Sequence, residues 1–219
     1  MAEDHTGLEV AIVGMACRYP GADSPAEFWS NLEAGAESIS FPSEEELVVA
    51  GVDVDEMFRP DYVKAGGWLK APFAFDNEFF AVSDLEADIM DPQQRVFLTC
   101  CWEAFEDAGY APEDLDAPAG VFAGAMENTY LREHVAPNKE RVAWLGAPLV
   151  SLSNHGTFMP TRASYKLNLT GPSLAVGTAC STGLVAVHLA CKALLAGECD
   201  FALAGASAIN FPHRVGYRF

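Results

Sequence analysis

Four short apolar runs suggest strands of a layered core. Residues 8–14 form a near-continuous apolar run that contains three β-branched side chains and ends at a glycine. Residues 121–124, 173–176 and 201–206 have the same character. Runs of this kind are typical of strands buried on both faces of a sheet. The pattern therefore predicts an α/β fold, with the run at residues 8–14 as its first buried strand.

Helices are predicted between these runs. Ser24 and Pro25 supply a capping side chain and a first-turn proline, so a helix is expected to continue to about Ala34 and to stop at Gly35. The clearest amphipathic helix opens at Asp91 and carries apolar residues at steps of three and four as far as a stop at Gly109. A further helix is predicted at residues 158–166. Residues 181–195 are almost wholly apolar, which predicts a helix in the centre of the molecule.

Residues 36–90 contrast with these periodic segments. They are rich in proline, glycine, phenylalanine and acidic residues. We expect a mostly irregular excursion with one short helix at residues 83–88, and long ordered excursions are usually functional or part of an interface. The chain shows no repeat with a period of 20 to 50 residues, which excludes solenoids and propellers.

The composition excludes some classes of binding partner. The 219 residues are 50% hydrophobic and carry 13 basic against 31 acidic side chains, a net charge of -18. Without a cluster of lysines and arginines, neither a nucleic acid nor an anionic membrane is an expected partner. The longest apolar runs fall well short of about 20 residues, and the acidic start does not resemble a signal peptide. A cytoplasmic location is therefore expected.

The chain contains six cysteines, which could be free thiols, disulfides or metal ligands. In a chain of this size without a secretory signal, free thiols are expected rather than disulfides. No C-x2-C pair is present, and Cys100 and Cys101 would diverge on a helix, so we expect no metal site. Most of the cysteines are interpreted as small buried apolar residues.

Cys180 is the exception among the cysteines. It lies where the strand at residues 173–176 passes through a tight turn into the helix at residues 181–195. The free N–H groups and positive dipole end of a helix start favour a thiolate and can bind an oxyanion. These are the requirements of thioester exchange. Cys180 is therefore the candidate catalytic nucleophile, against the alternative of a structural cysteine.

The histidines do not complete a catalytic pair. His188 is eight residues along the helix from Cys180, about 12 Å of rise and about 80° off its face, and is interpreted as a packed or hydrogen-bonded residue. His155 and His213 lie in loop-like segments, and His5 and His134 lie in polar surroundings. The sequence thus offers a nucleophile without a recognisable acid or base.

Six motifs are spread along the chain: VAIVGMACRYPG at residues 10–21, MDPQQR at 90–95, WEA at 102–104, EDAGY at 106–110, SYKLNLTGPS at 164–173 and TACST at 178–182. These motifs resemble those of the β-ketoacyl synthase, or ketosynthase, domains of modular polyketide synthases. Their spacing from residue 10 to about residue 217 is that of the family, which belongs to the thiolase superfamily.

The resemblance implies a fold, a reaction and a partner. The fold would be the five-layered, usually dimeric thiolase fold, with residues 1–219 as the N-terminal half of a ketosynthase domain. An acyl carrier protein would present an acyl group on its phosphopantetheine, Cys180 would take it, and a malonyl-type extender would condense with it after losing carbon dioxide. No cofactor would bind to the chain directly. The family's two histidines and a lysine belong to the C-terminal half, which is absent here.

The chain departs from the family pattern at two positions, one directly after the motif that contains Cys180 and one in the strand that follows the helix. Gly183 stands where the family often has serine, and Ala206 replaces a frequent glycine; both are expected to alter the acyl pocket. A cysteine rather than a glutamine at position 180 disfavours a chain-length factor or a decarboxylating loading domain.

Three alternative functions stay open. They are a split enzyme in a homo- or hetero-oligomer, a catalytically silent subunit that docks carrier proteins, and a transacylase. In each case the isolated chain is expected to aggregate or to need its complement.

Overall fold

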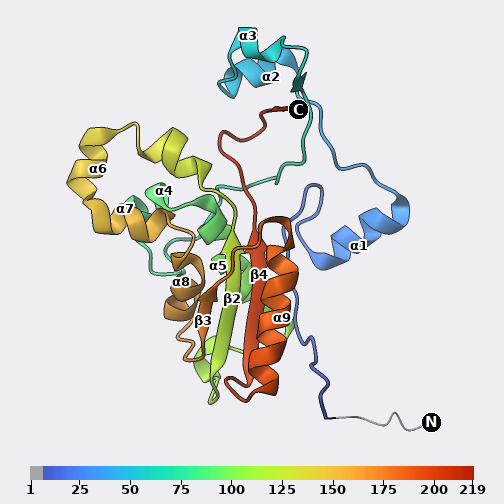
Figure 1. Cartoon of the computed structure of the whole chain (residues 1–219), viewed down its shortest axis with the longest axis vertical. Coiled ribbons are helices and arrows are strands. Elements are labelled where there is room, and N and C mark those ends of the chain that lie inside the picture. Colours follow the sequence, from blue (N-terminus) through green and yellow to red (C-terminus); the bar gives the residue numbers. More distant parts are fainter. Residues whose placement is uncertain (1–6) are drawn as a thin grey trace.

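A three-stranded parallel sheet lies at the centre of the computed structural model, which describes residues 7–219 (Figure 1). The strand order is β3 (Ser173–Ala175), β2 (Ala119–Ala125), β4 (Phe201–Ser207). β2 is the middle strand, and its Val121 pairs with Ser173 on one side and Leu203 on the other. The predicted strands at residues 121–124, 173–176 and 201–206 are confirmed with small shifts of their ends.

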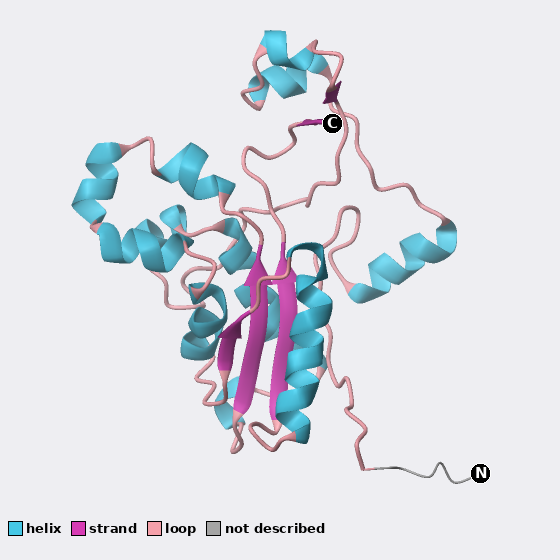
Figure 2. Cartoon of the chain, in the orientation of Figure 1, coloured by secondary structure: helices cyan, strands magenta, loops and turns pink. Residues whose placement is uncertain are grey.

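Helices cover both faces of this sheet (Figure 2). Val121 and Ala123 of β2 pack with α5 (Pro92–Asp107) and α8 (Phe158–Lys166). Phe122, which points to the opposite face as side chains alternate along a strand, packs with α9 (Thr182–Leu195). The α/β class expected from the sequence is therefore correct.

Local capping signals located the helix ends well. α1 (Pro25–Ala34) begins after Ser24, whose hydroxyl accepts the Glu27 N–H, and ends at Gly35 in the left-handed conformation. The Asp91 side chain caps α5 by accepting the Gln93 N–H. The predicted helix at residues 158–166 is α8 without a change of boundary.

The excursion at residues 36–90 is more ordered than predicted. It contains α2 (Glu44–Val49), α3 (Val54–Met57) and α4 (Asp84–Ile89), of which only the last was expected. α2 and α3 form a small lobe at the top of Figure 1. The lobe adjoins an antiparallel ribbon that is formed by β1 (Tyr62–Val63) and β5 (Tyr217–Arg218). Strands of two residues are too short to show any periodicity, so the hydrophobic pattern did not reveal them.

A second excursion connects β2 to α8. It contains the π-helix η2 (Leu131–Val135), α6 (Lys139–Leu145) and α7 (Ala147–Asn154), none of which was predicted. A small apolar cluster that includes Ile89 and Tyr130 holds these elements together. Two 3-10 turns, η1 (Pro112–Asp114) and η3 (Ala179–Ser181), complete the described elements.

Three expectations about burial were wrong. Residues 8–14 are extended but form no strand, and Ile12 is 78% exposed. α9 is buried on one face only, since Leu184 is 79% exposed, and the side chains of β4 are only partly buried. The common reason is that no described element pairs with the free edge of β4 or covers the outer face of α9.

Within residues 7–219, no helix has both the length and the apolar composition required to span a bilayer.

Candidate active site

The site is built on the turn that joins β3 to α9. After β3 the chain passes through Gly177 and Thr178 into η3, a single 3-10 turn that contains Cys180, and then directly into α9. Cys180 is exposed at the start of this helix, as predicted. Ala179, the residue before it, has a φ of +52°, which is unfavourable for a residue with a side chain. The turn therefore holds a strained backbone directly beside the thiol.

Hydroxyl groups hold this turn in place. The Thr182 Oγ1 donates to the Ala179 carbonyl at 2.7 Å and accepts the Thr178 N–H at 3.0 Å. The Ser181 Oγ donates to the Thr178 carbonyl at 2.8 Å. These hydrogen bonds link the residues on either side of Cys180, and they offset the strain at Ala179. Short polar side chains at a helix start signal capping, but the sequence did not show that both would bond back into the turn.

A close approach from β2 supports the turn from beneath. A Cβ atom at Gly124 would lie 1.9 Å from the Val176 carbonyl oxygen and 2.5 Å from the Thr182 Cγ2. Only a glycine permits this contact between the middle strand and the turn that contains Cys180. The role of Gly124 was missed because it depends on neighbours that are distant in the sequence.

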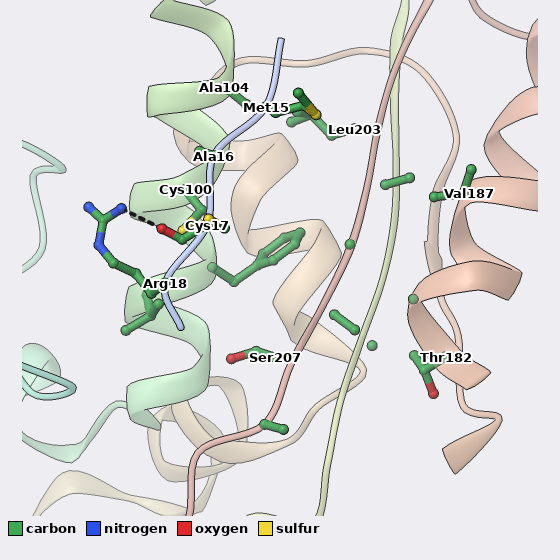
Figure 3. Close-up of a pocket in the computed structure, with 18 of the residues that line it drawn as sticks. Met15, Ala16, Cys17, Arg18, Cys100, Ala104, Thr182, Val187, Leu203 and Ser207 are labelled. Carbon is green, nitrogen blue, oxygen red and sulfur yellow. Dashed lines mark hydrogen bonds between the residues drawn. The ribbon is translucent and has the colours of Figure 1, made fainter. Parts of the chain in front are cut away.

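Cys180 opens onto a trough of about 2290 Å³. Figure 3 shows part of its wall: Met15 to Arg18 on the extended N-terminal segment, Cys100 and Ala104 on α5, Leu203 and Ser207 on β4, and Thr182 and Val187 on α9. The trough separates the segment at residues 8–16 from β4, and most of its lining is apolar. A thioester could reach the Cys180 sulfur from this side.

The immediate surroundings of Cys180 contain one useful donor. Its backbone N–H makes no hydrogen bond to any residue between 7 and 219, so it is free to bind an oxyanion. His188 is exposed on α9, and its imidazole makes no hydrogen bond within that same part of the chain. The expectation that His188 is packed or hydrogen-bonded was therefore wrong, because the outer side of α9 is uncovered.

The other histidines are engaged elsewhere. The His155 Nδ1 lies 2.8 Å from the Thr157 Oγ1, and the His213 Nε2 lies 3.0 Å from the Leu69 carbonyl oxygen. His213 lines the same trough as Cys180, and burial lowers its pKa. His134 is exposed, as its polar surroundings predicted, and it also contacts the rings of Tyr130 and Phe211. His5 lies outside the described residues.

The remaining cysteines differ from Cys180 in their environment. All six thiols are free. Burial raises the pKa of Cys100 to about 11 and the pKa of Cys101 well above its usual value, which keeps both as unreactive thiols. Over residues 7–219, no three histidine, cysteine or acidic side chains gather as a metal site. Cys180 is thus the most accessible thiol that the structure describes.

Comparisons with known proteins agree on the family. The family model described as "Beta-ketoacyl synthase, N-terminal domain" matches residues 8–219. A phenolphthiocerol/phthiocerol polyketide synthase protein from Mycobacterium tuberculosis is 46% identical over 214 residues, which are 95% of this chain and 14% of that protein. The pikromycin polyketide synthase component PikAII from Streptomyces venezuelae is 44% identical over 206 residues, 90% of this chain and 5% of that protein.

Solved structures give the same result for the fold. Ketosynthase twelve of the bacillaene polyketide synthase from Bacillus amyloliquefaciens superposes with a TM-score of 0.79 at 38% identity, covering 95% of this chain and 36% of that one. The ketosynthase from module 1 of the bacillaene synthase of the same species gives 0.76 at 32% identity, covering 99% and 36%. This chain thus spans about a third of those ketosynthases. It has the thiolase-like α/β fold and belongs to the family of β-ketoacyl synthase N-terminal domains found in polyketide synthases.

Proposed function

We propose that Cys180 captures an acyl group from the phosphopantetheine thioester of an acyl carrier protein. The Cys180 sulfur attacks the thioester carbonyl, and the bond between that carbon and the carrier sulfur breaks. The carrier sulfur leaves as a thiolate and takes up the proton that Cys180 lost. The products are an acyl-Cys180 thioester and a free carrier thiol.

One observation carries this proposal: Cys180 is an exposed thiol on a strained turn at the start of a helix, facing the trough. The turn is held by three hydrogen bonds and by the contact at Gly124. The free N–H of Cys180 can stabilise the oxyanion that forms when the carbonyl is attacked. This chain therefore supplies the attacking sulfur and one oxyanion donor for acyl capture.

Condensation is the second step that we propose. A malonyl-type group on a carrier protein would lose carbon dioxide, and the resulting carbanion would attack the acyl-Cys180 carbonyl. A carbon–carbon bond forms, and Cys180 is released as a thiolate. By the family resemblance, two histidines and a lysine of a complementary C-terminal half would serve this step, in a homo- or hetero-oligomer. Residues 1–219 would then act as the N-terminal half of the domain.

Mass spectrometry can test acyl capture on the protein that contains this chain together with its complement. Incubation with a butyryl carrier thioester should add one butyryl group, and peptide mapping should place it on Cys180. Cys180→Ala should abolish the adduct. Cys191→Ala is the matched control, because Cys191 is a half-buried free thiol that lines the same trough on the same helix. Its variant should load normally.

Two results would reject acyl capture by Cys180. One is an adduct that persists in Cys180→Ala, and the other is the absence of any adduct in the complete assembly. Addition of a malonyl carrier protein then separates two functions. A ketide product supports condensation, whereas loading without a product supports simple transacylation.

A further inference from the structure

Gly183 lies one helical turn beyond the proposed nucleophile. Residues three apart in a helical turn lie on the same side, so position 183 follows position 180 along the start of α9. Both residues line the trough, and so does Ala206 on β4. Ala206 is exposed where it faces Gly183. These two positions therefore face each other in the wall of the trough that Cys180 also lines.

Packing does not explain the glycine at position 183. A Cβ atom there would meet a single neighbour within 4 Å, the Cβ of Ala206, at 3.8 Å, which is ordinary van der Waals contact. By contrast, a Cβ atom at Gly14 or Gly171 would lie within 2.5 Å of backbone atoms. The backbone at Gly183 is also outside the left-handed region. Alanine would fit this position and would favour the helix.

We propose that Gly183 and Ala206 determine which acyl groups Cys180 accepts, by leaving room for a substituent on the carbon next to the thioester carbonyl. This inference rests on the proposed acyl capture by Cys180. The space of one missing side chain lies in the trough wall three residues after Cys180, and the first carbons of an acyl group bound to Cys180 must sit near the start of this helix. An acyl group branched at this carbon needs that space, whereas a straight chain does not.

The expected change in the acylation rate can be estimated from the behaviour of apolar pockets in general. One methyl or methylene group in such a pocket changes discrimination by about 10- to 200-fold. Gly183→Ala should therefore slow acylation by a branched group by about tenfold or more, and should change acylation by a straight group much less. Ala206→Val should act in the same direction from the neighbouring position on β4. Ala206→Gly should restore the branched substrate when combined with Gly183→Ala.

The test compares two thioesters with the same number of carbons. The full-length protein that contains this chain is incubated with butyryl- or isobutyryl-N-acetylcysteamine, and the rate of Cys180 acylation is followed by intact-protein mass spectrometry. The measured quantity is the isobutyryl-to-butyryl rate ratio. Gly156→Ala is the matched control, because its Cβ would meet only the Ala125 Cβ, at 3.7 Å, and because Gly156 lies outside the trough wall.

The outcomes are distinct. A ratio that falls about tenfold in Gly183→Ala and in Ala206→Val, and is unchanged in Gly156→Ala, supports the inference. Equal slowing of both thioesters, or an unchanged ratio in both trough variants, overturns it while acyl capture stands. If neither thioester acylates Cys180 in the unsubstituted protein, acyl capture itself has failed and the inference with it. Circular dichroism spectra of the variants show whether a rate change reflects a loss of folding.

Discussion

The two faces of the central sheet differ in how fully the apolar side chains around them are buried. On the face covered by α5 and α8, Val121 and Ala123 are 0% exposed and Leu98 is 1% exposed. Around α9 and the free edge of β4, equally apolar residues such as Leu184 and Ile12 are more than three-quarters exposed. The first face is a finished core, whereas the second has a small buried core beneath α9 and an uncovered apolar surface on the outer side of that helix. Burial in this chain therefore depends on which neighbours are present, not on the hydrophobicity of the segment.

The same substitution on the two faces gives the largest expected contrast. Leu98→Ala on α5 removes a fully buried side chain and should lower the free energy of unfolding by about 2–5 kcal/mol. Leu184→Ala on α9 should change it by less than about 0.5 kcal/mol. Urea denaturation followed by circular dichroism measures both. A Leu184→Ala cost close to that of Leu98→Ala would show that the two faces do not differ in this way.

The pH dependence of stability sharpens the description of the closed face. Asp91, the cap of α5, is 2% exposed, and burial raises its pKa to about 6 from 3.8 despite hydrogen bonds from Gln93. The folded state thus binds this proton more tightly than the unfolded state. The stabilisation from Asp91 is complete below about pH 4 and is lost as the pH rises through about 6. The shift corresponds to about 3 kcal/mol.

Asp91→Asn provides the comparison, because asparagine is neutral at every pH and keeps an oxygen for the Gln93 N–H. Between pH 4 and pH 7, the free energy of unfolding of the unsubstituted protein should fall by up to about 3 kcal/mol relative to that of the variant. Urea titrations at intervals of one pH unit across this range measure the change. A constant difference between the two proteins across the series would contradict a raised Asp91 pKa.

The smallest effect is expected at the turn that contains Cys180, on the open face. Glycine adopts positive φ without strain, so Ala179→Gly should relieve the backbone at φ +52°. Part of this gain is offset by the greater freedom of glycine in the unfolded chain, which leaves a stabilisation of about 0.5–1 kcal/mol. Acylation of Cys180 should nevertheless slow, because the turn becomes less rigid. An unchanged acylation rate would show that the strain at Ala179 does not position the thiol.

Sequence-based prediction worked best for features that depend on adjacent residues. Ser24 and Gly35 located the ends of α1, and the strand, turn and helix around Cys180 were found from their own composition. The prediction failed where a distant partner decides the outcome. Residues 8–14 have the composition of a strand, but a strand exists only when another one pairs with it. Likewise, the contact at Gly124 and the ring contact between His134 and Phe211 arise only when distant segments meet.

The ribbon of β1 and β5 has a consequence for the timing of folding. It joins residues 62–63 to residues 217–218, and the Arg218 Nε donates to the Glu56 Oε1, 162 residues away in the sequence. Chains are synthesised at about 5–20 residues per second. The partner strand β5 is therefore made on the order of ten seconds or more after β1. Segments such as α1 can form early from local contacts alone. The lobe of α2 and α3 must close late, after the sheet that carries Cys180 has been made.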